Sequence, residues 1–306
     1  MPMKQDDSAK PCTAGSARDS ESPCFSVHGA ASWHLPVLVS VPHAGRNYPD
    51  SLLQRARVPL GVIRRLEDRY VDMLATDAID RGCSAIIAHT ARAVIDLNRD
   101  PRDIETRMIA DFPDGVPVIQ SAKQRGGLGL FPKSLPRSGD LWRGAVSWEE
   151  AKRRIDEVHV PYHGAIARRI SEIRQHFGKA LLIDIHSMPP LDRRAGGERR
   201  PDFVIGDRFG SSASSRFADL ARSCVADAGY HCAVNHPYPG YFLLERHGRP
   251  SEGVHALQIE VSRDLYLDDS LDKPGTGLPA IRSLLAELIE TLGEEALDRN
   301  LPIAAE

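Results

Sequence analysis

The chain has 306 residues, of which 42% are hydrophobic and 26% are charged, and this composition is ordinary for a globular protein. Its 39 basic and 42 acidic residues leave a formal net charge of −3. No field of one sign dominates, so the composition does not favour nucleic acid or an acidic membrane as a partner.

Two further features concern the cellular compartment. No apolar run is as long as the roughly 18 residues of a membrane span, and the N-terminal "MPMKQDDSAK" lacks the apolar core of a secretory signal. The five cysteines form no CxxC pair, and their odd number favours reduced thiols over a disulfide framework. We therefore expect a cytoplasmic protein without a transmembrane helix.

The chain is expected to begin with a segment that lacks structure. Residues 1–33 are rich in Ser, Ala, Pro, Asp and Gly and have no periodicity, which predicts a disordered tail. Residues 34–306 then form a single domain. The β-branched run "LPVLVSVPHAG" at 35–45 predicts a strand that Pro42 and Gly45 end.

The next part of the chain combines short elements with one long irregular segment. A helical stretch is expected over 51–82, with breaks near Pro59 and Asp68, and 83–100 indicates two short strands. The span 101–146 is rich in Gly, Pro, Arg and Asp. Long structured segments of this kind are often functional in compact domains.

The rest of the chain alternates between helices and strands. Helices are predicted at 147–177, 213–228 and 275–297, and strands at 180–185, 202–206, 231–234 and 254–261, with an Arg-rich loop at 191–201 and the loop "NHPYPGYF" after the third strand. This alternation indicates an α/β fold, a three-layer sandwich with a central mixed, mostly parallel sheet.

Three of the expected strands end in polar residues. "VSVPHAG" places His43 just past an apolar strand, "LLIDIHSM" does the same with His186, and "QIEVSRD" places Glu260 late in a strand. Ligands bind at the carboxyl ends of strands in open α/β sheets, and zinc prefers nitrogen and oxygen donors. The pair of histidines therefore favours a metal site, although either histidine alone suits a structural hydrogen bond.

A third ligand is sought in "RRLEDRYVDML", residues 64–74. This stretch offers Glu67, Asp68 and Asp72, and either Glu67 or Asp68 suits the start of a helix facing inward. The alternative for each is a helix cap or a surface charge.

Glu260 is the residue best suited to acid–base chemistry. In the strand "VHALQIEV", Leu257, Ile259 and Val261 share one face, while Gln258 and Glu260 share the other. A carboxylate in such an apolar strand is costly unless it is paired or functional. It is either a general base for hydrolysis or one half of a buried ion pair with an arginine.

The stretch "HTARAVIDLNRD" surrounds an apolar core with Arg92, Asp96, Asn98 and Arg99. Either arginine can hold a carboxylate with two parallel hydrogen bonds, which a lysine cannot reproduce. The alternative is that one of them pairs with Asp96 or another buried acid.

The motifs in combination resemble one known family, that of the N-formylglutamate amidohydrolases (N-formylglutamate deformylases). The resemblance extends over about residues 35–290, in matching order, and it is carried by "VSVPHAGRNYP", "EDRYVDML", "ARAVIDLNRDPRD", "LLIDIHSMPP", "PDFVIGD" and "ERHGRPSEGVHALQIEVSRDLYLD". It implies a fold like that of the phosphorylase/hydrolase-like zinc exopeptidases. It also implies metal-dependent hydrolysis of a formyl amide to formate and glutamate, a step of histidine catabolism.

The resemblance also implies roles for individual residues. His43, Asp68 and His186 match the zinc ligands, with another divalent metal as the alternative, and Glu260 matches the catalytic carboxylate. Asp184 lies on the same face of the strand as His186 and would fix the orientation of an imidazole as a hydrogen-bond partner.

Three further residues, Arg92, Asn98 and Arg99, match the segment expected to bind the substrate carboxylate. Two alternatives to an N-formylglutamate hydrolase stay open. One is an amidohydrolase that acts on another N-acyl amino acid or on a peptide amide. The other is a non-catalytic protein that binds a metal or a carboxylate ligand, for which a base such as Glu260 would be unnecessary.

Overall fold

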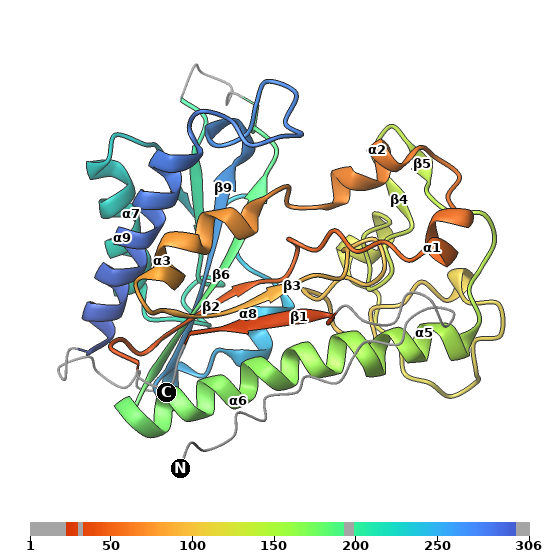
Figure 1. The fold of residues 1–306 in the computed structure, drawn as a ribbon. Coiled ribbons are helices and arrows are strands. Elements are labelled where there is room, and N and C mark those ends of the chain that lie inside the picture. The colour runs from red at the N-terminus through yellow and green to blue at the C-terminus, as the bar shows by residue number, and fades with distance from the viewer. Residues whose placement is uncertain (1–22, 30–32, 193–198, 298–306) are drawn as a thin grey trace, which may run out of the picture.

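The computed structural model describes residues 23–29, 33–192 and 199–297 (Figure 1). Within this part of the chain, seven strands form one sheet in the order β1-β3-β2-β6-β9-β7-β8. Only the β1–β3 and β7–β9 pairs of this sheet are antiparallel. The strands are β1 (Phe25–His28), β2 (Val37–Val41), β3 (Ser84–Ala88), β6 (Ala180–Met188), β7 (Phe203–Gly206), β8 (Cys232–Val234) and β9 (Val254–Ser262), and a separate hairpin joins β4 (Ser134–Leu135) to β5 (Gly139–Asp140).

The helices range from single turns to long amphipathic elements. The α-helices are α1 (Asp50–Gln54), α2 (Leu60–Ile63), α3 (Thr76–Asp80), α4 (Ala122–Arg125), α5 (Trp148–Arg154), α6 (Val160–Phe177), α7 (Ser215–Asp227), α8 (Phe242–His247) and α9 (Leu278–Leu297). Short 3-10 turns are η1 (Arg64–Leu66), η2 (Val71–Ala75), η3 (Thr106–Met108), η5 (Pro250–Glu252) and η6 (Arg263–Leu265), and the π-helical turn η4 (Ile155–His159) joins α5 to α6.

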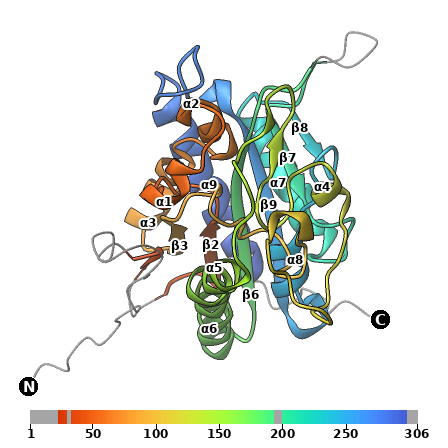
Figure 2. The same ribbon diagram turned by 90° about the vertical axis from the view of Figure 1, so that its right-hand side faces the viewer.

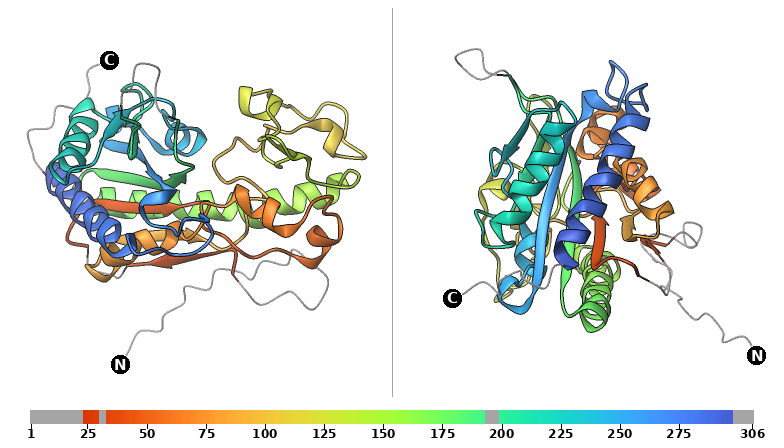
Figure 3. Two further views of the ribbon diagram at one scale, coloured as in Figure 1. Left: turned by 90° about the horizontal axis from the view of Figure 1, so that it is seen from above. Right: turned by 90° about the vertical axis from the view of Figure 1, so that its left-hand side faces the viewer.

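The sheet is covered on both faces, which gives the three expected layers. Apolar side chains of α3, α7 and α9 pack on one face, and α7 and α9 lie side by side there (Figure 3). Helices α6 and α8 pack on the other face, together with apolar side chains of 91–146. In the view of Figure 2, the 101–146 segment, coloured yellow, stands in front of β6 and β9.

The two faces of the central strands differ in how far their apolar character extends. On the α9 side, the alternate residues Leu181, Ile183 and Ile185 of β6 and Leu257, Ile259 and Val261 of β9 are all apolar and buried. On the α6 side, Leu182 and Ala256 are followed by polar residues toward the carboxyl ends. There the strand register pairs Asp184 with Gln258 and His186 with Glu260. The polar residues of the sequence motifs therefore gather at one edge of the sheet.

Most predicted elements are confirmed, but two are wrong. Residues 91–100 do not form a second strand after β3. Their apolar side chains are buried without pairing in the sheet, because the Asp96 carboxylate accepts a hydrogen bond from the Asn98 backbone N–H (2.9 Å) and holds the chain in a turn. The second error is an omission: helix α8, which begins at Phe242, the last residue of the expected loop "NHPYPGYF", was not predicted.

The N-terminal prediction also needs correction. Residues 25–28, placed in a disordered tail from composition, form β1 and pair with β3 at the edge of the sheet. The compositional bias of 1–33 concealed a short strand whose Phe25 is apolar and buried. Residues 1–22, 30–32 and 193–198 of the predicted tail and Arg-rich loop lie outside the described residues.

Two other expectations concern cysteines and membranes. Cys83, Cys224 and Cys232 are free thiols, as expected. Over the described ranges, none of the helices combines the length and apolarity needed to cross a bilayer.

The correction at β1 gives a direct test. Phe25 is 7% exposed and its ring meets that of Tyr162 edge-on at 5.7 Å, whereas Val27 is 43% exposed. Phe25→Ala should lower the free energy of unfolding in urea by on the order of 3 kcal/mol, because it leaves a cavity under the sheet edge. Val27→Ala in the same strand should change it by about 0.5 kcal/mol or less. Equal effects would mean that β1 does not pack as described.

Candidate functional site

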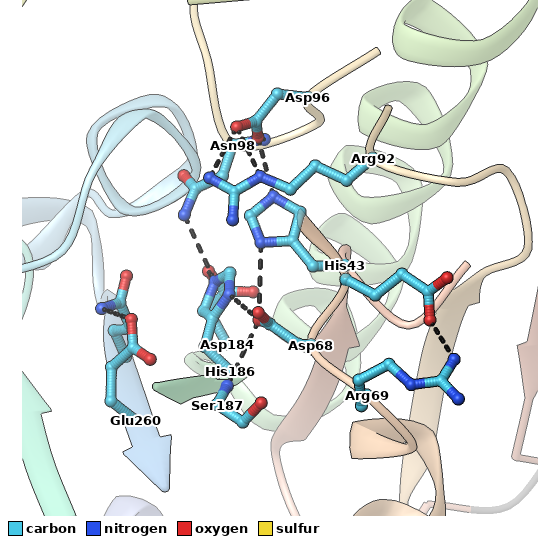
Figure 4. A network of polar contacts seen from close by, with 12 residues as sticks. His43, Asp68, Arg69, Arg92, Asp96, Asn98, Asp184, His186, Ser187 and Glu260 are labelled. Carbon is cyan, nitrogen blue, oxygen red and sulfur yellow. Dashed lines mark hydrogen bonds and ion pairs between the residues drawn. The ribbon is translucent and has the colours of Figure 1, made fainter. Parts of the chain in front are cut away.

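The three residues expected to bind metal converge at the carboxyl edge of the sheet (Figure 4). His43 lies just beyond β2, His186 lies near the end of β6, and Asp68 follows η1, where its backbone N–H donates to the His43 carbonyl (3.0 Å). Asp68 Oδ2 lies 3.5 Å from His43 Nδ1 and 3.0 Å from His186 Nδ1. All three side chains are buried, and one potential ligand atom from each lies within 4.8 Å of the others.

A second carboxylate lies behind each imidazole. His43 Nε2 donates to Asp96 Oδ1 and His186 Nε2 donates to Asp184 Oδ2, both at 2.7 Å. A carboxylate accepts hydrogen bonds, so these contacts place a proton on each Nε2, and Nδ1 is the ring nitrogen that each histidine would offer to a metal ion. Asp184 is fixed in turn by the Ser40 hydroxyl, which donates to Oδ1 at 3.0 Å.

This arrangement fits a divalent metal ion. Within the described part of the chain, His43 Nδ1 is buried and has no hydrogen-bond partner. Such an atom is costly to leave unsatisfied, and a metal ion would satisfy it. The donor set of two imidazole nitrogens and one carboxylate oxygen suits zinc and leaves room for a water or substrate oxygen.

The protonation of the buried acids follows from their partners. Burial alone would raise the pKa of Asp68, but the adjacent His186 and His43 imidazoles hold it well below its usual range. Burial likewise opposes ionisation of Asp96, and Arg92 and His43 outweigh it, so its pKa is also well below the usual value. Both carboxylates are therefore ionised and able to support cations.

The structure distinguishes among the three acids of the 64–74 stretch. Glu67 turns away from the histidines, where it accepts hydrogen bonds from the Tyr48 hydroxyl and, at 2.5 Å, from Arg69 Nη1. Asp72 pairs with Arg46. Asp68 alone of the three faces both histidines.

Arg263 and Ser187 hold the Asp68 carboxylate from the other side. Arg263 Nη2 donates to Asp68 Oδ1 at 3.1 Å, and the Ser187 backbone N–H donates to Oδ2 at 3.2 Å. Sequence reasoning did not identify Arg263, although it stands three residues after Glu260 in the motif "QIEVSRD".

Glu260 lies opposite His186 in the strand register and lines the same pocket. Its Oε1 accepts a hydrogen bond from Gln258 Nε2 at 3.0 Å, and among the described residues no arginine forms an ion pair with it. The pKa of Glu260 is raised to about 7, mainly by burial; the His186 charge opposes this shift and the Asp68 charge adds to it. A carboxylate with this pKa can accept and return a proton near neutral pH.

Arg92, Asn98 and Arg99 all line the pocket, but each also has a structural partner. Arg92 pairs with Asp96 through Nε and Nη2, both at 2.8 Å, which is the pairing that the sequence left open as an alternative. Asn98 Nδ2 lies 3.3 Å from His186 Nε2, and its Oδ1 accepts the Leu243 backbone N–H. Arg99 donates to the carbonyls of Leu128 and Asn98.

Two buried histidines that sequence reasoning missed fix the backbone around Asn98. His163 Nε2 donates to the Leu97 carbonyl at 2.8 Å, so its Nδ1 is the acceptor for His247 Nε2 at 2.9 Å. His159 Nε2 donates to the Arg99 carbonyl at 2.9 Å. Burial lowers the pKa of His163 well below its usual value, which agrees with a neutral ring. His159 and His163 lie at helical spacing, and from the sequence alone this spacing indicates only the buried face of a helix.

The pocket above the ligands has a volume of about 180 Å³. Its lining is strongly basic. The charged side chains in it are Arg65, Asp68, Arg92, Arg99, Lys123, Glu260 and Arg263. Lys123 comes from α4, in the segment expected to be functional from its length and composition.

An α/β sandwich with a His–Asp–His group, an adjacent buried glutamate and a basic pocket at the carboxyl edge of its sheet has the features of a metal-dependent hydrolase. The family model for N-formylglutamate amidohydrolase matches residues 35–267. The chain therefore belongs to the N-formylglutamate amidohydrolase family, and the resemblance seen in its motifs is confirmed.

Similar proteins agree with this assignment. An N-formylglutamate deformylase from Pseudomonas aeruginosa is 30% identical over 267 residues, which cover 84% of this chain and 92% of that protein. One from Pseudomonas putida is 30% identical over 243 residues, covering 77% and 83%. The crystal structure of an N-formylglutamate amidohydrolase from Ralstonia eutropha JMP134 has a TM-score of 0.82 at 29% identity and covers 89% of this chain and 98% of that chain.

Proposed function

We propose that this protein hydrolyses the amide bond of N-formyl-L-glutamate to formate and L-glutamate. The observation that carries the proposal is the placement of Glu260 beside the His43–Asp68–His186 group in one basic pocket, in a chain that belongs to this family. The proposal also assigns the protein to histidine catabolism in the cytoplasm.

The metal in this proposal is zinc, held by Nδ1 of His43, Nδ1 of His186 and Oδ2 of Asp68, although the same donors accept other divalent ions. When bound, such an ion polarises a carbonyl and acidifies a coordinated water. Asp96 and Asp184 would keep the imidazoles oriented toward the ion, since each fixes the proton on the opposite ring nitrogen.

The chain's own residues supply proton transfer and orientation. Glu260 takes a proton from the water that attacks the formyl carbon and then returns it to the departing amine nitrogen. Arg92 and Arg99, together with Asn98, line the same pocket and would hold the substrate carboxylate, so the amide is presented to the base in a fixed geometry. Burial of Glu260 keeps its pKa close to the pH at which both transfers must occur.

A substrate panel tests the reaction itself. Purified protein with its metal content measured by elemental analysis should release formate from N-formyl-L-glutamate. N-acetyl- and N-succinyl-L-glutamate should be cleaved at least about 10-fold more slowly, since the 180 Å³ pocket has little room for a larger acyl group. Faster cleavage of another acyl group would assign the protein to a different substrate, and no cleavage of any amide would favour a binding role.

Two substitutions separate metal binding from proton transfer. His186→Ala should lose both the metal and the activity, because it removes a ligand. Glu260→Gln should keep stoichiometric metal and lose about 100- to 10,000-fold in kcat, because it removes only the base. A His186→Ala protein that retains its metal would show that the ligand set is wrong, and full turnover by Glu260→Gln would exclude the general-base role.

The pKa of Glu260 gives a pH prediction. The base must be ionised to accept a proton, so kcat/KM should fall as the pH decreases through the pKa of this carboxyl. Burial raises that pKa to about 7, and a bound cation would lower it, so the midpoint should lie at or below about 7. The measurement is kcat/KM for N-formyl-L-glutamate against pH, and a rate that stays constant from about pH 8 to about pH 4 would contradict the assignment.

A further inference from the structure

The pocket contains one cation whose role the reaction above does not explain. Lys123 is half-buried and lines the pocket, and within the described residues its ammonium forms neither an ion pair nor a hydrogen bond. Among the residues that the structure describes, the ammonium instead faces the rings of Tyr241 and Tyr238, whose centroids lie 5.1 and 6.0 Å from Nζ. The other pocket cations each bond to at least one oxygen of the protein.

A second cation shares one of these rings. The Arg99 guanidinium lies 5.0 Å from the Tyr241 centroid. Arg99 directs Nε and Nη1 to backbone carbonyls, and its distance to the nearest Asp96 oxygen is 3.9 Å. Two cations beside one ring repel each other unless an anion compensates their charge. The part of the pocket that carries Lys123 and Arg99 therefore attracts a carboxylate.

The helix that carries Lys123 is held in place by polar contacts on its other side. Ser121 caps α4 by accepting the Gln124 backbone N–H, and its hydroxyl donates to Asp103 Oδ2 at 2.7 Å. The Lys123 carbonyl accepts the Leu128 backbone N–H, and Leu128 in turn accepts from Arg99 Nε. The lysine is therefore positioned by the same backbone that supports Arg99.

The charges in the pocket match a substrate with two carboxylates. Arg92 bonds to Asp96, the carboxylate that also holds His43, so it lies at the end where the amide is cleaved. Lys123 has no recorded contact, in the part of the chain described, with a candidate metal ligand or its supporting acids. If one carboxylate of the substrate binds near Arg92, its second carboxylate is available to bind Lys123.

We propose that Lys123 binds the side-chain carboxylate of the substrate and makes the enzyme selective for N-acyl derivatives of dicarboxylic amino acids. This inference rests on the proposed hydrolysis and extends it to the residue that distinguishes glutamate from uncharged amino acids. Lysine suits the task because its three donors rotate freely and its charge is not already committed to a protein acid.

The test compares two substrates that differ by one charge, N-formyl-L-glutamate and N-formyl-L-glutamine. Lys123→Gln should lower kcat/KM for the glutamate derivative roughly 10- to 100-fold and change that for the glutamine derivative less than about 3-fold. Lys123→Arg, which keeps the charge, should retain most of the preference. Arg125→Gln is the matched control, because Arg125 lies on the same helix, is exposed and donates to the Gln120 carbonyl outside the pocket.

A binding measurement keeps this proposal separate from the hydrolysis. Calorimetric titration with L-glutamate and L-glutamine requires no turnover, and Lys123→Gln should abolish the preference for glutamate. If the wild-type protein binds glutamate preferentially but releases no formate, the proposed reaction fails while the role of Lys123 stands. If Lys123→Gln and Arg125→Gln behave alike, or if both ligands lose affinity equally, the proposal is wrong.

Discussion

The site depends on one electrostatic requirement. The negative charges of four buried acids must be balanced by groups of the protein, because solvent does not reach them. Asp68, Asp96, Asp184 and Glu260 are each 8% exposed or less. The first three are stabilised by imidazole, guanidinium or hydroxyl donors, and those same contacts orient the two histidines toward Asp68. The same network therefore compensates the buried charges and orients the candidate metal ligands. Glu260 is the exception, because it has an amide donor and no ion pair among the described residues, so burial raises its pKa.

The sheet provides the rigidity that this network needs. The parallel register of β6 and β9 places His186 directly beside Glu260, and a one-residue shift of β9 would turn Glu260 to the α9 face. The apolar residues on that face prevent such a shift, since moving them would expose the core. The polar half of each strand is therefore held in place by the apolar face of the same strand.

Features that depend on local pattern could be predicted from the sequence, and features that depend on distant contacts could not. Strand alternation identified the face of Glu260, and the apolar runs ending in His43 and His186 indicated the edge of the site. The family resemblance supplied the choice of Asp68. Arg263 was missed because its partners Asp68 and Glu67 lie far from it in the sequence. The apolar residues of 91–100 suggested a strand, because buried residues in a turn have an amino-acid composition similar to that of buried residues in a sheet.

Reaction chemistry and substrate selection have different structural origins in this fold. The candidate ligands and base depend on strands β2, β6 and β9 and on the turn after η1, so their geometry is set by the core. Lys123 instead depends on a one-turn helix in the 101–146 segment, held by Ser121 and Asp103. Because Lys123 lies outside the sheet, its substitution would leave the strand register intact, so the proposed amino-acid preference can change while the candidate hydrolytic residues stay in place. The same segment packs Leu130, Phe131 and Leu141 into the core, so the proposed specificity residue is carried by a loop that the core itself holds beside the site.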